Sequence, residues 1–399
     1  MSPESSSSAK SLGIEERFLL DVVGACLKEE ELPNPPDNFS EDEFAKLARA
    51  HRVAPLIGYA VRDRGARGFS SALRAKLDLE LTVAVAIETR QSSEIAKIDE
   101  RFKAAKIRFL PLKGRVAREF YKEPFLRPMN DYDVLIDETD AEKVANVLTQ
   151  LGYVPVSSEL QGFRKDNWFE VDLHFNSPLQ EGARGAGPNF WSARIPLDDF
   201  EYRFSKEDFY RYMIEHFAKH WKRGGALLRD YCDIAIYSRK FGGELDREKL
   251  DSELERYGLA RFVRNLERLV DSMFFGGETD PLLDELTRYA FGRLDEKDES
   301  RKALKIAAIG SEIPQNASFR WARVVASRVF PRAAKMHFAR RVQALPPALR
   351  ITKKIALWIG YWARRLFRVG FFKNAFALLA GNRRAENEIE AFYRRAGLP

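Results

Sequence analysis

The spacing of apolar residues predicts that residues 12–106 are mainly helical. Apolar side chains recur every three to four positions, which is the period of one face of a helix. A proline-rich stretch at 32–39 predicts a linker, because proline cannot continue a helix. Ser40, followed by three acidic residues, is typical of a helix start. Helical spacing then runs to Val61 and resumes over 71–106.

The pattern changes within residues 107–204. Residues 107–112 form a short apolar run, which is consistent with a buried strand. Apolar and polar residues alternate over 131–137 and 168–175, as they do in strands with one buried face. Residues 140–151 have helical spacing, and helical patterns return after the region and continue almost to the end. The predicted fold class is therefore α+β, a small mixed β-sheet core flanked by N-terminal helices and a long C-terminal helical region.

These patterns divide the chain into five predicted segments. They are a Ser-rich disordered tail (1–11), an N-terminal helical region (12–106), a core that contains the sheet (107–204), a helical region that completes the core (205–300), and a basic helical C-terminal region (301–399).

Composition limits the class of protein. With 399 residues, of which 45% are apolar, the chain can build one large or two ordinary domains. Its two cysteines lie outside any CxxC or CxxH pattern, so neither a zinc site nor a disulfide framework is expected, and a reducing cytoplasm is the predicted location. The longest apolar window, 355–363, is too short to span a bilayer and is bracketed by basic residues.

Charge is distributed unevenly along the chain. Residues 301–399 contain 21 Lys and Arg against 4 Asp and Glu, whereas the remainder contains 45 against 55. Two explanations are open: the basic region packs against the acidic body, or it binds an anionic partner.

Within 353–370, an apolar stripe faces a basic side when the residues are placed on a helix. That profile fits an interfacial helix that holds the protein at the periphery of an anionic membrane. It also fits a core helix of a C-terminal bundle with a solvated basic face, which is the commoner case. Nucleic acid ranks third, because the sequence has no RNA-recognition signature.

Three aspartates form the strongest chemical pattern. Asp131 and Asp133 are two residues apart on a predicted strand, so their carboxylates share one face. Two adjacent carboxylates repel each other unless a cation lies between them, and Mg²⁺ (or Mn²⁺) is the natural choice. Asp172, on another predicted strand, supplies a third carboxylate. Together they suit a two-metal site in which one ion activates a hydroxyl and the other holds a triphosphate.

Residues before these strands suit phosphate binding. Gly114 stands at a predicted strand-to-helix turn, where the backbone can approach an anion. Lys113 or Arg127 could neutralise charge on a transferred phosphoryl group. Alone, each piece has a plainer explanation: a DxD on a solvated face, a simple turn, Asp172 on an edge strand, or His174 as a satisfied surface histidine. Their order along the chain favours a site.

That order resembles the DNA polymerase β-like nucleotidyltransferase superfamily, whose pattern is a glycine motif, a DxD-type pair and a third carboxylate. More closely, the chain resembles the bacterial uncharacterised nucleotidyltransferase family over roughly residues 15–300. The resemblance is carried by AHRVAPL (50–56), LKG (112–114), RPMNDYDVL (127–135), VDLHF (171–175) and LLRDYCD (227–233).

The resemblance implies roles for individual residues. Asp131 and Asp133 correspond to metal ligands, and Asp172 corresponds to the third acid. Lys113 and Gly114 replace the superfamily's usual Gly-Ser pair, and Arg115 stands where the serine would be. Phosphate contact could therefore fall to Lys113, to Arg115 or to the backbone.

Three further residues are secondary candidates, namely His174, Arg229 and Asp230. Arg229-Asp230 resembles a basic–acidic pair that follows the core in toxin-like relatives. A surface salt-bridge ladder that also includes Asp233 is the alternative. His216 and His220, four apart on one helical face, are expected to pack or to form hydrogen bonds.

Two functions are compatible with these patterns. The first is an enzyme that transfers NMP from an NTP to a hydroxyl-bearing acceptor (a small molecule, a sugar, RNA or protein) and releases pyrophosphate. The alternative is a catalytically altered binding protein with the same fold, acting at a membrane surface or on another anionic partner. The complete set of three aspartates favours the enzyme, and the changed Gly-Ser position favours the alternative mildly.

Overall fold

The computed structural model describes residues 12–156, 160–166, 168–175, 191–222, 225–292 and 383–398. The predicted tail 1–11 and the predicted amphipathic helix within 353–370 lie outside these ranges. The chain divides into two units. One comprises Met1–Trp221, Gly225–Asp295 and Arg394–Pro399, and the other comprises Lys222–Gly224 and Glu296–Tyr393. The first unit contains the β-sheet and the N-terminal helices.

The N-terminal helices are α1 (Ile14–Lys28), α2 (Glu41–Ala50), α3 (Ala54–Arg64) and α4 (Ser71–Ala104). Ser40 caps α2 as predicted, since its hydroxyl accepts a hydrogen bond from the Glu43 N–H at 3.4 Å. The predicted continuous helix to Val61 is wrong, because the chain breaks between α2 and α3. Arg52 adopts the left-handed conformation (φ 60°), and Pro55 cannot donate to an earlier turn.

A five-stranded mixed sheet follows, in the order β1-β2-β5-β4-β3. Strands β2 and β5 are parallel, and the other neighbours are antiparallel. Strand β4 was not predicted, because Phe163 is the only large apolar residue in it. The bounds are β1 (Phe109–Pro111), β2 (Asp131–Ile136), β3 (Val154–Pro155), β4 (Gly162–Lys165) and β5 (Phe169–His174), with a separate pair β6 (Ile195–Pro196) and β7 (Tyr202–Arg203).

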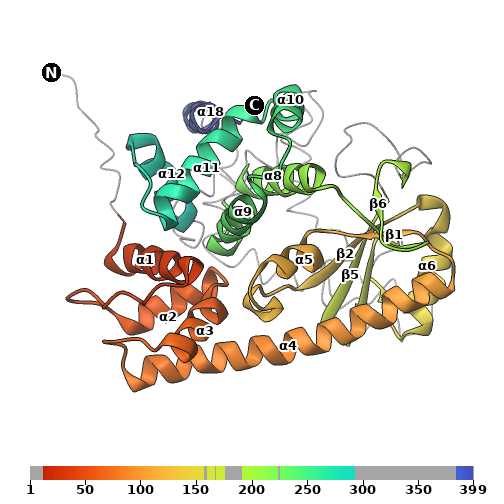
Figure 1. Ribbon diagram of the computed structural model, residues 1–399, viewed down its shortest axis with the longest axis horizontal. Coiled ribbons are helices and arrows are strands. Elements are labelled where there is room, and N and C mark those ends of the chain that lie inside the picture. The colour runs from red at the N-terminus through yellow and green to blue at the C-terminus, as the bar shows by residue number, and fades with distance from the viewer. Residues whose placement is uncertain are drawn as a thin grey trace, which may run out of the picture. The chain divides into compact units, whose positions relative to one another are not determined.

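Strand alternation separates a core face of the sheet from a polar face. Exposure along β5 alternates residue by residue, as the sequence predicts. The apolar side packs on the C-terminal half of the long helix α4 and on α6 (Ala141–Gln150), which lie along the sheet in Figure 1. The shared core includes Ile95, Ile98, Phe102, Tyr132, Val134, Val144, Leu148 and Val171. Burial of this face fixes the strand register and turns the aspartates to the other side.

Short helices join β1 to β2 and β2 to α6: α5 (Lys113–Ala117) and the 3₁₀ turns η1 (Arg118–Phe120), η2 (Pro124–Leu126) and η3 (Glu138–Asp140). Helices return after the sheet as α8 (Lys206–Lys222), α9 (Leu228–Phe241), α10 (Arg247–Arg256), α11 (Ala260–Phe274), α12 (Pro281–Gly292) and α18 (Arg383–Ala396). The predicted α+β class, with helices on both sides of the sheet in sequence, is confirmed.

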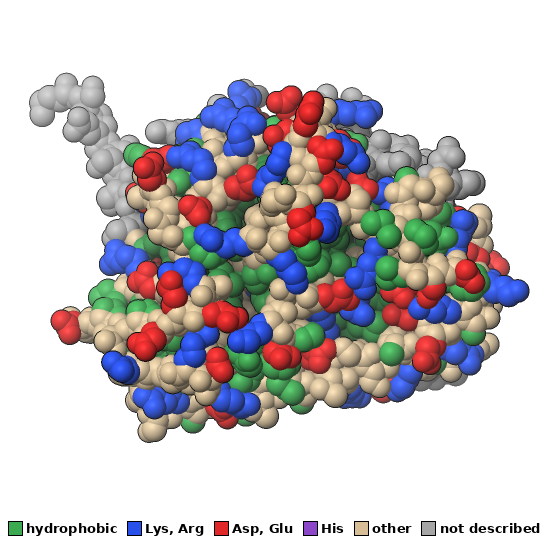
Figure 2. Space-filling model, viewed as in Figure 1, with side chains coloured by type: hydrophobic (Ala, Val, Ile, Leu, Met, Phe, Trp, Pro, Cys, Tyr) green, Lys and Arg blue, Asp and Glu red, His purple; other side chains and the backbone are tan. Residues whose placement is uncertain are grey.

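The surface of the described residues is strongly charged, with acidic and basic side chains interspersed over the face shown in Figure 2. Among those residues, no helix has the length and apolar character needed to cross a membrane.

Candidate metal centre

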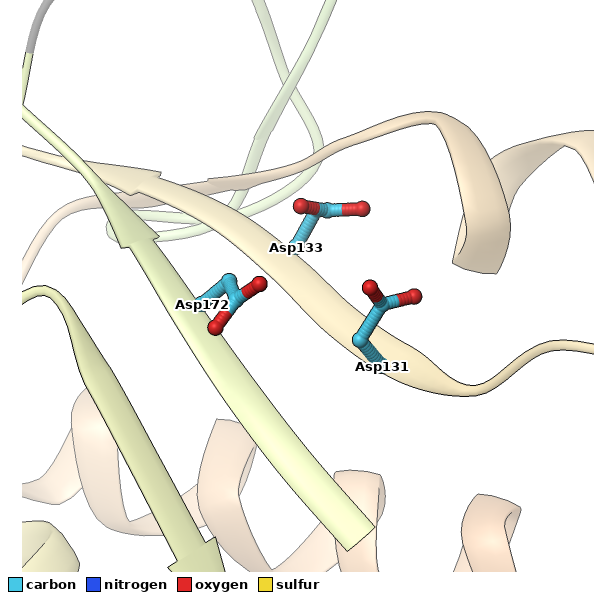
Figure 3. A group of neighbouring side chains, drawn as sticks. All are labelled: Asp131, Asp133 and Asp172. Atoms are coloured by element: carbon cyan, nitrogen blue, oxygen red, sulfur yellow. The ribbon is translucent and has the colours of Figure 1, made fainter. Parts of the chain in front are cut away.

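The parallel pairing of β2 with β5 assembles the three predicted aspartates. Asp133 lies directly opposite Asp172 in the register, and Asp131 is two residues earlier on the same face of β2. One carboxylate oxygen from each residue lies within 4.8 Å of the other two. Figure 3 shows the three carboxyl groups on the same side of the two strands. Oxygens at these separations can share one divalent cation.

The carboxylates destabilise one another's charged forms. Burial, followed by the charges of Asp133 and Asp131, raises the pKa of Asp172 to about 6. Burial and the charge of Asp133 also raise the pKa of Asp131. A cation between them would remove this repulsion. Since all three donors are hard carboxylate oxygens, the set fits Mg²⁺ or Mn²⁺ better than a soft metal.

His174 lies at the edge of the aspartate group. Its Nε2 is 2.8 Å from Asp133 Oδ1, and its side chain is 41% exposed. The imidazole therefore holds one oxygen of Asp133 in place. The three aspartates, without His174, are the group whose ligand atoms converge within the described part of the chain. His174 is thus placed to orient the Asp133 carboxylate.

Lys113 brings a positive charge to the same site. Its ammonium lowers the pKa of Asp131, and it lines a small cavity together with His216, His220 and Asp230. Burial lowers the pKa of Lys113 to about 8, although Asp230 opposes the shift. Among the described residues, no side chain forms a hydrogen bond or ion pair with this ammonium. Its charge is close enough to the aspartates to affect the pKa of Asp131.

Gly114 packs closely against the segment that precedes Asp131. A Cβ at this position would lie 2.8 Å from Met129 Sδ, which is closer than real contacts allow. The sequence predicted that a glycine at this position lets the backbone approach a phosphate. The structure shows a second reason, since helix α5 must approach Met129 closely.

A comparison with family models places these residues in a known group. The model described as "Uncharacterised nucleotidyltransferase" matches residues 37–275, which include the whole sheet and all three aspartates. The chain belongs to this uncharacterised nucleotidyltransferase family. Neither the search of curated proteins nor the search of solved structures gave a match.

Two arginines that were predicted to contact phosphate in this nucleotidyltransferase have protein partners. Arg115 forms an ion pair with Glu119, one turn further along the chain. Arg127 is 1% exposed and binds Asp233 through Nε and Nη2, at 2.7 and 2.6 Å. The Tyr121 hydroxyl donates to the same carboxylate at 2.8 Å. Arg127 therefore joins α9 to the segment before β2. The two residues are 106 positions apart, so residue spacing in the sequence could not reveal the pair.

Arg229 and Asp230 form a buried pair close to the metal centre. Arg229 Nη2 donates to Asp230 Oδ1 at 2.9 Å, and Nη1 donates to the Pro128 carbonyl at 2.8 Å. Burial raises the pKa of Asp230, but the charges of Arg229 and Lys113 overcome this and lower it far below its usual range. With Asp230 9% exposed and Asp233 6% exposed, the alternative of a surface salt-bridge ladder is wrong.

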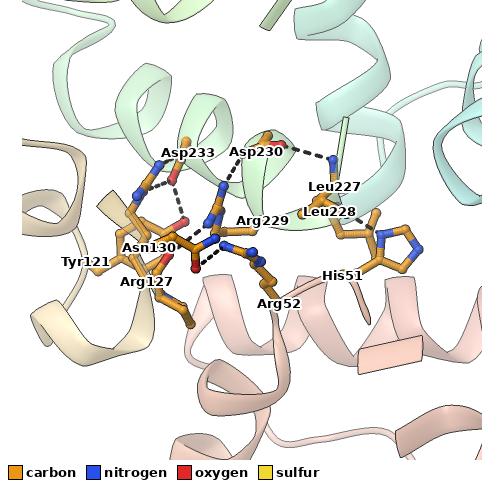
Figure 4. Close-up of polar contacts among 11 residues, drawn as sticks. His51, Arg52, Tyr121, Arg127, Asn130, Leu227, Leu228, Arg229, Asp230 and Asp233 are labelled. Atoms are coloured by element: carbon orange, nitrogen blue, oxygen red, sulfur yellow. Dashed lines mark hydrogen bonds and ion pairs between the residues drawn. The ribbon is translucent and has the colours of Figure 1, made fainter. Parts of the chain in front are cut away.

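Three of the motifs that carry the family resemblance, AHRVAPL, RPMNDYDVL and LLRDYCD, contact one another, as Figure 4 shows. Arg52 Nη1 donates to Asn130 Oδ1 at 2.9 Å, directly before Asp131. His51 Nδ1 accepts a hydrogen bond from the Leu228 N–H at 3.2 Å. The AHRVAPL segment, to which the sequence assigned no role, therefore contacts both the residue before Asp131 and the start of α9.

Helix α8 adds residues behind Lys113. The rings of His216 and His220 pack at a centroid distance of 4.4 Å, which agrees with the packing expected for this pair. Burial and the charge of Lys113 lower the pKa of His216 to about 2, so the ring is neutral. Burial raises the pKa of Tyr212 well above its usual range, and the charges of Asp133 and Asp131 add to the shift, whereas the backbone of Lys113 opposes it. No sequence motif marks Tyr212 as part of the site.

Proposed function

We propose that this nucleotidyltransferase moves NMP from an NTP to a hydroxyl group of an acceptor and releases pyrophosphate. The observation that carries the proposal is the convergence of Asp131, Asp133 and Asp172 on one face of the sheet. Carboxylates that raise each other's pKa favour a bound cation, and NTPs reach such enzymes as metal complexes.

Mg²⁺ or Mn²⁺ held by these aspartates would activate the acceptor hydroxyl and neutralise charge on the leaving pyrophosphate. The chain's own residues prepare the site for this chemistry. His174 orients the Asp133 carboxylate, and the Arg52–Asn130 contact holds the start of β2. Side chains that are already held in position favour the reaction, because they need not reorganise while it proceeds.

Lys113 takes over the triphosphate contact in this proposal. Lys113 and Gly114 stand in place of the superfamily's Gly-Ser pair. The Lys113 ammonium affects the pKa of Asp131, and among the described residues no side chain forms a hydrogen bond or ion pair with it. With a pKa of about 8, it is mostly protonated at neutral pH. A protonated ammonium near half-buried carboxylates would therefore offer a charge-assisted hydrogen bond to a phosphate oxygen.

The test follows release of pyrophosphate from each of the four NTPs, with Mg²⁺ or Mn²⁺, and transfer of label to added acceptors or to the protein itself. We expect release by the wild type and at least a thousandfold loss in the double variant Asp131→Asn, Asp133→Asn. Asp166→Asn is the matched control, because Asp166 is exposed in a left-handed turn that asparagine tolerates.

A missing acceptor could hide activity, so metal-dependent NTP binding is measured in the same series. Equal NTP binding by the wild type and the double variant, with no pyrophosphate release from either, would refute the proposal. NTP binding that needs the metal and the aspartates, again without release, would favour the catalytically altered binding protein instead.

A further inference from the structure

A second cavity, of about 160 Å³, lies away from the metal centre. Its walls come from α1, α3, η1, η2 and α9, and it shares no lining residue with the aspartate group. Most of the surface is apolar, supplied by Leu56, Ala60, Phe120, Leu126 and Ile236. An apolar cavity of this size is large enough for an organic molecule and is therefore a candidate binding site.

One charged residue in the wall is incompletely satisfied. Arg64 lines the cavity with a side chain that is 19% exposed. Its Nε is buried and has no hydrogen-bond partner among the described residues. The nearest acid, Asp63, is 3.9 Å from Nη1, at the limit of an ion pair. Because Nε is out of reach of water, the Arg64 side chain meets the cavity through its other atoms, which account for its exposed fraction.

The other charges of the cavity compensate each other. Lys122 and Glu29 lie 3.5 Å apart, and both are largely exposed. The ammonium of Lys122 also lies 5.7 Å from the centre of the Tyr59 ring. The cavity thus offers one weakly paired positive charge, at Arg64, whose acid partner Asp63 is 3.9 Å away. That charge suits a monoanion, whereas a phosphate dianion would need further donors.

The size and rigidity of the cavity narrow the class of ligand. An apolar cavity of roughly 150 Å³ is known to accommodate benzene. The wall at Tyr121 is fixed, because its hydroxyl donates to buried Asp233 at 2.8 Å. A preformed wall lowers the conformational cost of binding.

We propose that this cavity binds a small carboxylate with a benzene-sized apolar body. The carboxylate accepts hydrogen bonds from the Arg64 guanidinium, and the apolar body packs on Leu56, Ala60 and Leu126. The proposal does not depend on the reaction at the metal centre.

The test is a fluorine NMR titration of the full chain with 4-fluorobenzoate. We expect saturable binding by the wild type with a Kd of about 1 mM or lower. Ala60→Leu fills the cavity and Arg64→Gln removes its charge, so each should weaken binding at least tenfold. Arg62→Gln is the matched control, since Arg62 lies on the same helix but pairs with exposed Asp78 at 2.6 Å; its Kd should not change.

The neutral analogue 4-fluorobenzyl alcohol separates charge from shape. It should bind the wild type at least tenfold more weakly than the carboxylate, and this preference should disappear in Arg64→Gln. Circular dichroism and Mn²⁺ affinity confirm that each variant is folded. The proposal is overturned if the wild type shows no saturable binding, or if folded Arg64→Gln binds the carboxylate as tightly as the wild type. If Ala60→Leu does not fold, Arg64→Gln alone decides.

Discussion

Aspartates serve two opposite purposes in this protein. In the buried cluster, Asp233 accepts hydrogen bonds from Arg127 Nε, Arg127 Nη2 and the Tyr121 hydroxyl. In the metal centre, Asp131 and Asp172 face further carboxylates, and their pKa values rise. The fold compensates the first charge internally and leaves the second group to be compensated by an external cation. Carboxylates whose charge has no basic partner in the fold therefore distinguish the candidate site from the structural aspartates.

The largest expected effect comes from breaking the compensated cluster. Asp233→Ala should lower the free energy of unfolding by about 3–5 kcal/mol, because it leaves the buried Arg127 charge unpaired. Urea denaturation measures the change. The double variant Arg127→Met, Asp233→Leu removes both charges and should lose less than the single variant. A loss below about 1 kcal/mol for Asp233→Ala would show that the cluster contributes little to stability.

A smaller effect is expected where Lys113 meets the metal centre. Lys113→Gln should weaken NTP affinity roughly 10- to 100-fold at saturating metal, since a charge-assisted hydrogen bond contributes about 1.5–3 kcal/mol. Isothermal titration calorimetry measures the affinity, and Lys143→Gln, exposed on α6, is the matched control. Arg115→Gln is the competing variant. If it weakens binding more than Lys113→Gln, the triphosphate contact belongs to Arg115.

Acidification should weaken metal binding. The pKa of Asp172 is about 6 without metal, so below that pH a proton must leave before the carboxylate can bind the ion. One competing proton predicts a fall in Mn²⁺ affinity of about tenfold, or 1.4 kcal/mol, between pH 7 and pH 5. Electron paramagnetic resonance of free Mn²⁺ measures it. The dependence should be much weaker in Asp172→Asn, and a wild-type Kd that is constant over this range would contradict the prediction.

The smallest expected effect is a gain in stability. Because the folded-state pKa of Asp172 is raised, the folded protein holds a proton that the unfolded chain has released, so metal-free stability falls as the pH rises from about 4 through 6. At neutral pH, Asp172→Asn should stabilise the metal-free protein by about 0.5–1 kcal/mol, a value reduced for partial exposure.

Thermal unfolding with a chelator measures this gain, with Asp166→Asn as the unchanged control. Saturating Mg²⁺ should reverse the order, because only the wild type then gains the full binding free energy. A destabilised Asp172→Asn without metal would mean that Asp172 has a structural partner.

Much of the sheet could be predicted because its pattern is local. The alternation over 131–137 and 168–175 predicted both β2 and β5, and it placed Asp131, Asp133 and Asp172 on polar faces. The β2–β5 register, which brings Asp133 opposite Asp172, depends on sheet order. Periodicity does not contain that order, so the sequence did not predict it, and only the proximity of Asp172 was expected, from the family resemblance.

Other features depend on contacts that leave no local signal. The helix breaks at Arg52 because this residue adopts the left-handed backbone conformation, which glycine and asparagine normally adopt. The partner of Arg127 lies on α9, and Tyr212 belongs to a helix that reads as ordinary core. The direction of a long side chain is set by tertiary packing. Hence, Arg127 could be predicted as a functional arginine but not as a buried ion pair.

Because Gly114 and Met129 are in contact, substitutions in one of their two motifs constrain substitutions in the other. A Cβ at position 114 would lie 2.8 Å from Met129 Sδ, so an alanine there requires the Met129 side chain to shift or to be replaced by a shorter one. Across descendants of a common ancestor, the two positions should consequently vary as a pair. The turn that carries Lys113 and the segment that leads to Asp131 are coupled through this contact, and grafting either motif alone into another scaffold would lose it.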